Sequence, residues 1–166
     1  GICQLPSGTI LLFDGATLVA ITEDSGNTWT VTDGSIARLA GLPFAGVSAK
    51  SSVAYHGGYL TLVIQTHAAS SAYQYTSTDN GGNWAPDPYG AMDALGAQCF
   101  GLPDGGVGMV YVEPTDRTLL YATKPSPFAA FDLDNAVVIY DGDTNKASCD
   151  TKDDISHLAA CVGQDG

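Results

Sequence analysis

Two stretches of the sequence decide the fold: residues 22–29 read Thr22-Glu23-Asp24-Ser25-Gly26-Asn27-Thr28-Trp29, and residues 77–84 read Ser77-Thr78-Asp79-Asn80-Gly81-Gly82-Asn83-Trp84. They share the pattern S/T-x-D-x-G-x-T/N-W and start 55 residues apart. The aspartate can accept backbone N–H bonds across a tight turn, and the glycine can adopt a positive φ. The tryptophan can fold into the sheet packing below the turn. The pattern predicts two equivalent structural turns, built on Asp24, Gly26 and Trp29 and on Asp79, Gly81 and Trp84.

A second repeat surrounds these turns and sets the length of the repeating unit. Leu-Pro-x-Gly occurs at Leu5–Gly8 and again at Leu102–Gly105, 97 residues later, and His56-Gly57-Gly58 lies near half that offset. The unit is therefore about 48 residues long, which is the length of a β-propeller blade. A β-sandwich has similar turn spacing but need not repeat a motif.

Short β-rich runs separated by turn residues indicate strands in each unit. We expect strands at residues 9–13, 17–22, 28–32, 52–55, 59–66, 72–77, 108–112 and 118–123, with a third round opening at Cys99 and a fourth beginning at residues 137–140. Four short strands per unit are typical of a propeller blade.

Composition agrees with an all-β chain and excludes several partners. Glycine accounts for 20 of 166 residues, and 16 of the 18 acidic residues are aspartate, a turn former, rather than glutamate, a helix former. The net charge is −12 with only six lysines and arginines. Six scattered cations do not neutralise a phosphate backbone, so nucleic acid is excluded as a partner. No apolar run is long enough for a membrane span.

The turn pattern resembles the Asp-box, or bacterial neuraminidase repeat, of sialidase-like β-propellers, whose pattern is S-x-D-x-G-x-T-W. The first copy departs only at Thr22 and the second only at Asn83. The third round has Thr123–Phe128 where a box would fall, so that copy is expected to be lost. In the family, the box is a folding element on the face of a blade away from the catalytic pocket.

The resemblance implies an all-β fold of Asp-box propeller blades. At about 48 residues each, 166 residues supply three to four blades of an incomplete ring, with a small four-bladed ring as the alternative. We assign residues 1–135 to Asp-box blades. Residues 136–166 are either a partial fourth blade or an acidic, cysteine-containing C-terminal segment.

The residues that the family's sialidases use are incomplete in this chain. The resemblance implies three arginines that hold a carboxylate, together with a tyrosine nucleophile, a glutamate and an acid/base aspartate. The chain has only Arg38 and Arg117, Glu23 lies inside a box, and Glu113 precedes a proline. We therefore expect no catalytic residues. Other Asp-box propellers cleave β-glucans with two carboxylates, but no aspartate pair is marked here.

The chain has four cysteines, Cys3, Cys99, Cys149 and Cys161, without zinc-ligand spacing. An even count of this kind predicts two disulfides and an oxidising compartment, hence an extracellular or cell-surface protein. Cys149 and Cys161 could pair locally, which leaves Cys3 with Cys99, although all three pairings stay open. The alternative is four free thiols.

One acidic stretch partly matches a calcium loop. Asp141, Asp143 and Asn145 follow the opening D-x-D-x-N, but Lys146 and Lys152 replace the glycine and the closing glutamate. Asp150 or Asp153 could substitute for that glutamate, so Ca²⁺ is the one cofactor considered, against a solvated acidic loop. The three histidines show no metal spacing, and His56 is expected in an exposed turn.

These observations predict a non-catalytic, extracellular Asp-box module that acts in binding or assembly. Its partners would be other protein chains or further blades of the same protein. Carbohydrate is a further candidate, although tyrosine in a strand usually serves sheet packing. The tyrosines that could line a sugar-binding surface are Tyr55, Tyr59, Tyr73, Tyr75, Tyr111 and Tyr121. The alternative is a piece of a secreted glycosidase, sialidase-like or β-glucan-cleaving, whose site is completed by missing blades.

Overall fold

The structure is a computed structural model that describes residues 1–14, 17–31, 49–66, 71–115 and 118–140. Across these ranges the chain forms twelve β-strands and no helix, hence none that could cross a membrane. The strands make three four-stranded sheets, each with its strands in chain order. Every neighbouring pair is antiparallel. The predicted all-β fold of consecutive four-stranded blades is confirmed, and the described residues do not close a ring.

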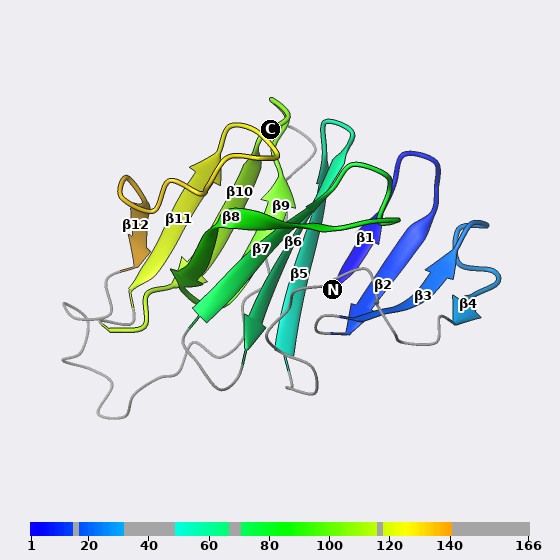
Figure 1. The fold of residues 1–166 in the computed structure, drawn as a ribbon, viewed down its shortest axis with the longest axis horizontal. Coiled ribbons are helices and arrows are strands. Elements are labelled where there is room, and N and C mark those ends of the chain that lie inside the picture. Colours follow the sequence, from blue (N-terminus) through cyan, green and yellow to red (C-terminus); the bar gives the residue numbers. More distant parts are fainter. Residues whose placement is uncertain (15–16, 32–48, 67–70, 116–117, 141–166) are drawn as a thin grey trace.

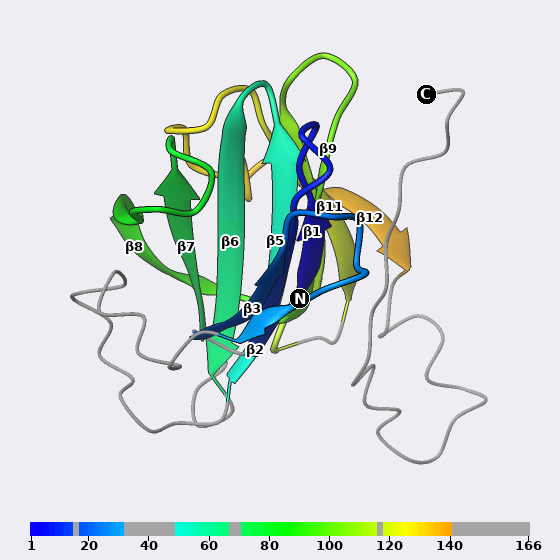
Figure 2. The same cartoon turned by 90° about the vertical axis from the view of Figure 1, so that its right-hand side faces the viewer.

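Each sheet is one blade, and the three blades follow one another along the chain. The first blade contains β1 (Ile2–Gln4), β2 (Ile10–Asp14), β3 (Thr17–Thr22) and β4 (Thr30–Val31). The second contains β5 (Ala49–His56), β6 (Tyr59–Thr66), β7 (Ser71–Ser77) and β8 (Ala85–Asp93). The third contains β9 (Leu95–Gly101), β10 (Val107–Val112), β11 (Leu119–Lys124) and β12 (Val137–Tyr140). Figure 1 shows them side by side in chain order, and Figure 2 views them from the side of the first blade.

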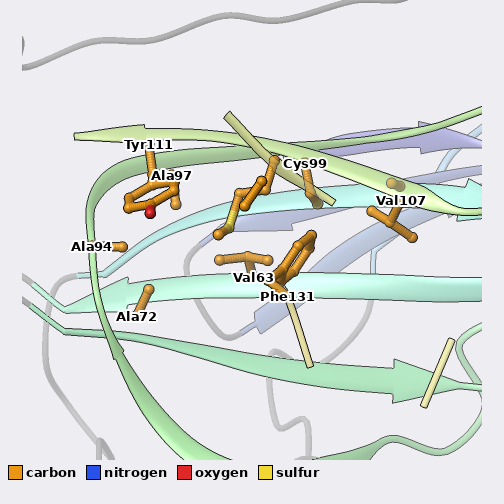
Figure 3. Close-up of a cluster of buried hydrophobic side chains, with 11 residues drawn as sticks. Val63, Ala72, Ala94, Ala97, Cys99, Val107, Tyr111 and Phe131 are labelled. Carbon is orange, nitrogen blue, oxygen red and sulfur yellow. The ribbon is translucent and has the colours of Figure 1, made fainter. Parts of the chain in front are cut away.

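The second blade is buried on both faces because it lies between the other two. Along β6, Leu60, Leu62 and Ile64 belong to one apolar cluster, which also contains Leu11 and Phe13 of the first blade. Val63, which alternates with them, belongs to a second cluster shared with the third blade. Because side chains alternate along a strand, one central strand supplies both seams between the blades. Figure 3 shows the second cluster, with Phe131 beside Val63.

The first strands of the blades lie next to one another, since β5 contacts both β1 and β9. At the second seam, the Cys99 N–H donates to Ser52 Oγ at 2.9 Å and the Ser52 hydroxyl donates to the Cys99 carbonyl at 3.3 Å. Gly101 permits this close approach, because a Cβ at that position would lie 2.4 Å from the Tyr55 carbonyl oxygen. The backbones of β5 and β9 therefore pack directly against each other.

Two boundaries differ from the sequence-based expectation. The third blade begins at Leu95 rather than Cys99, and Val137–Tyr140 pairs with β11. This segment therefore completes the third blade and does not open a fourth round. A long connection of residues 125–136 separates it from β11. Because of that length, the sequence does not predict that the two strands pair.

Replacing Trp84 by alanine should lower the free energy of unfolding by about 3–5 kcal/mol, because Trp84 is 7% exposed and fills the first seam. Trp29→Ala should cost about 1 kcal/mol or less when measured at high dilution, because Trp29 is 41% exposed. Urea denaturation of the two variants measures both values. If the two variants lost the same free energy of unfolding, Trp84 would not be the one of the two tryptophans that is packed in a seam.

Candidate functional site

The second aspartate turn, residues 77–84, is organised around one carboxylate. Asp79 Oδ1 accepts the Asn83 N–H at 2.7 Å and the Ser77 hydroxyl at 2.9 Å, while Oδ2 accepts the Asn83 side-chain amide at 2.6 Å. Ser77 Oγ in turn accepts the Gly81 N–H at 2.9 Å. The carboxylate thus closes the turn between β7 and β8.

The first aspartate turn, residues 22–29, repeats this geometry. Asp24 Oδ1 accepts the Thr28 N–H at 2.8 Å and the Thr22 hydroxyl at 2.7 Å, and Oδ2 accepts the Thr28 hydroxyl at 2.6 Å. The Gly26 N–H donates to Thr22 Oγ1 at 3.0 Å. The departures at Thr22 and Asn83 are therefore conservative, since each keeps the donor that the pattern supplies.

Both turns contain a left-handed pair of residues. Gly26 and Gly81 have φ of 95° and 87°, as their place in the pattern predicts. The residues before them, Ser25 and Asn80, are also left-handed, with φ of 59° and 56°. The sequence pattern does not predict this second left-handed position, although asparagine, present at position 80, is a residue type enriched in this conformation.

The carboxylates of the two turns are held ionised. Hydrogen bonds from the Thr28 side chain, the Thr28 N–H and the Thr22 hydroxyl lower the pKa of Asp24 from 3.8 to about 2. The pKa of Asp79 is lowered, chiefly by the Asn83 N–H. A carboxylate that stays ionised accepts hydrogen bonds but does not donate a proton at neutral pH. Neither aspartate therefore has the character of a catalytic acid.

These shifts predict a loss of stability in acid. Because the folded-state pKa lies below the unfolded value, the stabilisation is complete above about pH 4 and is lost as the pH falls toward 2. The Asp24→Asn, Asp79→Asn double variant should have a lower melting temperature than the wild type at neutral pH. Its melting temperature should also fall less than that of the wild type between pH 4 and 2. Thermal unfolding followed by circular dichroism measures this. Asp93→Asn, at the end of β8, is the control; a double variant that keeps the wild-type acid response would contradict the prediction.

A third turn of the same shape lies between β11 and β12, with different chemistry. The Ala129 N–H donates to the Ser126 carbonyl at 3.2 Å, just as the Gly82 N–H donates to the Asp79 carbonyl at 3.1 Å. Lys124, fully buried, stands where the other turns begin with Thr22 or Ser77, and its Nζ donates to the Pro127 carbonyl at 2.8 Å. The side-chain pattern is lost at this position, as expected, but the backbone turn remains.

In the second and third turns, the aromatic residue that ends the turn packs against the preceding blade. Trp84 contacts Phe13 of the first blade edge to face, with 5.7 Å between ring centres. Phe131 ends the third turn, is 5% exposed, and belongs to the cluster shared with the second blade. Trp29 has no preceding blade among the described residues and keeps 41% of its surface exposed. Only two of the three aromatic residues are therefore buried in a seam.

The side of the first blade around Trp29 is apolar and incompletely covered. Strand register places Ile2 opposite Leu12, as it places Val53 opposite Leu62 in the second blade. Ile2 is 63% exposed, whereas Val53 is 8% exposed and Leu62 is fully buried. We call this side the first-blade face and define it by Ile2, Ile10, Leu12 and Trp29. It is the surface that the same positions of the second blade bury in a seam.

The predicted disulfide between Cys3 and Cys99 is wrong. Both cysteines are free and buried. Cys3 lies in the cluster between the first and second blades, whereas Cys99 lies in the cluster between the second and third. The Cys99 Sγ is within hydrogen-bond reach of the Ser52 carbonyl at 3.4 Å and the Thr61 carbonyl at 3.7 Å. β5 separates the two thiols, so this pair gives no support for an oxidising compartment.

Burial raises the pKa of both thiols, Cys3 and Cys99, to about 11. A maleimide reagent should therefore label neither thiol within minutes in the folded protein at pH 7, because the reactive thiolate is scarce and covered. In non-reducing denaturant both thiols should react, as peptide mass spectrometry would show. A Cys3–Cys99 disulfide recovered from the oxidised protein would contradict the structure.

The remaining predicted metal and disulfide residues lie outside the described residues: Asp141, Asp143, Asn145, Asp150, Cys149 and Cys161. The calcium prediction and the Cys149–Cys161 pairing therefore stay predictions. Arg38 and Arg117 also lie outside them. Within the described ranges, no three histidine, cysteine, aspartate or glutamate side chains are placed to hold a metal ion.

His56 is buried, contrary to the expectation of an exposed turn. It is 3% exposed, with Nδ1 3.1 Å from the Gly105 carbonyl and Nε2 2.9 Å from Thr61 Oγ1. Because a carbonyl only accepts, Nδ1 carries the hydrogen of the neutral ring. Burial lowers the pKa of His56 and favours this neutral form. His56 thereby joins the β5–β6 hairpin to the third blade and is not available as a ligand.

Two places that could hold catalytic groups lack the required character. A hollow of about 360 Å³ beside the first turn is lined by Ile21, Glu23, Asp24, Thr28 and Thr30. Its Asp24 is committed to the turn. Tyr111 lies near Glu113, but Tyr111 is 3% exposed, and burial, with a smaller effect of the Glu113 charge, raises its pKa. A covered hydroxyl with a raised pKa is not an accessible nucleophile.

No protein-family model matches the sequence, and a comparison with curated protein sequences found no match. Among solved structures, the chain is similar to a mutant of NanB sialidase from Streptococcus pneumoniae, with 18% sequence identity and a TM-score of 0.49. The similarity covers 72% of this chain and 20% of the sialidase. The chain therefore spans about a fifth of that protein, and at this identity the likeness concerns the fold alone.

Proposed function

We propose that this chain is a non-catalytic propeller module of the Asp-box type, which works by packing an end blade against a further blade. One observation carries the proposal: Ile2 and Trp29 are 63% and 41% exposed, whereas Val53 and Trp84, at the same positions of the second blade, are 8% and 7% exposed. The first blade thus carries the residues of a seam, and no blade among the described residues covers them.

The free energy gained by covering the first-blade face favours association with a further blade. Covering one large apolar side chain contributes about 1.5–3 kcal/mol, and the first-blade face presents several. The structure already contains the matching contact twice, once at each seam. A blade from the same protein or from another chain would supply the same chemistry. An extracellular or cell-surface location belongs to this proposal as an expectation drawn from the cysteine count; the Cys3–Cys99 pair does not support it.

Carbohydrate binding and glycoside hydrolysis receive less support. Among the tyrosines considered for a sugar-binding surface, Tyr75 and Tyr111 are each 3% exposed in the apolar clusters. Packing within and between the sheets explains the presence of both tyrosines. The turn aspartates are ionised acceptors, and a glycosidase also requires a carboxylic acid that donates a proton.

Two measurements test the proposal. The purified chain should release no fluorophore above the blank from a sialoside or a β-glucan substrate, while an active sialidase and a glucanase serve as positive controls. An apolar dye should bind the chain at high dilution and bind less to the Ile2→Lys, Trp29→Ser double variant. Turnover of either substrate, or dye binding that the double variant leaves unchanged, would overturn the proposal.

A further inference from the structure

We propose that the seam between the second and third blades is an acid-sensitive joint, which is closed while the His56 ring is neutral and which opens when that ring takes up a proton. This inference goes beyond the proposed function and does not depend on it. Its starting point is a buried histidine that bonds across the seam and faces a buried lysine of the other blade.

His56 is the last residue of β5 and contacts the third blade directly. Its Nδ1–H donates to the carbonyl of Gly105, in the turn between β9 and β10, at 3.1 Å. A Cβ at Gly101 would lie only 3.3 Å from the His56 Cβ, so a side chain there would crowd the histidine. Within the second blade, Nε2 accepts the Thr61 hydroxyl at 2.9 Å. The imidazole is therefore fixed at a point where the two blades meet.

Lys124 lies on the side of the third blade that His56 contacts. Strand register pairs Gly101 of β9 with Val107 of β10, and Val107 with Lys124 of β11, and directly paired residues share a face of the sheet. Val107 belongs to the apolar cluster between these two blades (Figure 3). The Lys124 side chain is fully buried, and its Nζ donates to the Pro127 carbonyl at 2.8 Å. The ammonium group is therefore held in the same seam as the His56 ring.

The other groups around the His56 ring come from its own hairpin, from β9 and from the β9–β10 turn. The Tyr59 ring of the hairpin has its centre 6.4 Å from that of His56. Burial raises the pKa of the Cys99 thiol of β9 to about 11, so this thiol stays protonated at neutral pH and below. Asp104 of the turn is exposed and accepts a backbone N–H of its own turn at 3.0 Å. Water and salt screen an exposed carboxylate more than a buried ammonium group. Among the described residues, the charge that acts on the ring is therefore that of Lys124.

These surroundings favour the neutral ring while the seam is closed. Burial lowers the pKa of His56, the Gly105 carbonyl raises it, and the Lys124 charge lowers it again, with a net decrease. A histidine in water has a pKa near 6.5, so the open seam binds a proton at a higher pH than the closed seam. The closed form is therefore fully favoured above about pH 6.5 and loses this advantage as the pH falls. Opening becomes at most about 25-fold more frequent at pH 5 than at pH 7.

The two described cysteines report on the two seams separately. At the second seam, the Thr76 hydroxyl donates to the Pro127 carbonyl at 3.0 Å, and Ser52 exchanges hydrogen bonds with the Cys99 backbone. Separation of the second and third blades breaks these bonds and exposes the Cys99 thiol. Cys3 belongs to the cluster of the first seam, so its thiol stays covered. The turn aspartates stay ionised between pH 7 and pH 5 and do not contribute to the change.

Thiol reactivity of the full chain, measured against pH, tests the proposal. Dithiodipyridine reacts with thiols in acid solution, and peptide mass spectrometry gives the rate for each cysteine. Dividing the rate in denaturant by the rate in the folded protein at the same pH gives the protection of each thiol. In the wild type, the protection of Cys99 should fall at least about tenfold between pH 7 and pH 5, while that of Cys3 should change less than about twofold.

Three variants assign this response to its groups. His56→Asn keeps an N–H donor for the Gly105 carbonyl but takes up no proton in this range, so its Cys99 protection should be equal at pH 7 and pH 5. Lys124→Met keeps a long buried side chain without the charge and should show a smaller fall than the wild type. His67→Gln is the matched control, because it removes another of the three imidazoles and should keep the wild-type response. Circular dichroism spectra at pH 7 show which variants are folded.

Three results would overturn the inference: equal Cys99 protection at pH 7 and pH 5 in the wild type; a parallel loss of protection at Cys3, which would mean that the whole chain unfolds; or a wild-type fall in folded His56→Asn. A measurement on the wild type alone covers the case in which that variant does not fold. In an NMR titration with through-bond assignment, the His56 ring should titrate below the usual histidine range. Titration at or above that range would contradict the inference as well.

Discussion

In the second and third blades, the aromatic side chain that ends the turn between the third and fourth strands joins its blade to the blade before it. Trp84 does this at the first seam and Phe131 at the second, and the apolar clusters between the blades form around these two rings. Because side chains alternate along a strand, the apolar residues of β6 are divided between the two seams. The three sheets therefore pack together because Trp84 from the second turn and Phe131 from the third each cross to the preceding sheet.

The turn chemistry serves this aromatic contact. In the two aspartate turns, the carboxylate fixes a left-handed pair of residues and directs the chain toward the tryptophan. In the third turn, buried Lys124 takes the first position and donates to a carbonyl, and its Nζ lies 5.4 Å from the centre of the Phe131 ring. Two different charge arrangements thus give one backbone turn. The requirement common to all three is the position of the aromatic ring.

The sequence was sufficient to predict the aspartate turns and the strand order, because both depend on residues close together in the chain. It was insufficient for Cys3 and Cys99, whose relation depends on which side of a strand each occupies. The Leu-Pro-x-Gly repeat has an offset of 97, while the cysteines are 96 apart, and a shift of one residue reverses the side of the sheet. The prediction of an exposed His56 is wrong because its partner Gly105 comes from another blade, which the local sequence does not reveal. Trp29 and Trp84 look alike in sequence, and only the presence of a preceding blade separates them.

The chain has two tryptophans, so fluorescence of single-tryptophan variants measures the central contact directly. In a Trp29→Phe variant, Trp84 should emit at short wavelength and resist quenching by acrylamide at every protein concentration. In a Trp84→Phe variant at high dilution, Trp29 should emit at longer wavelength and be readily quenched. Equal protection of both residues at high dilution, or a readily quenched Trp84, would contradict the account that each blade buries its turn aromatic against the blade before it.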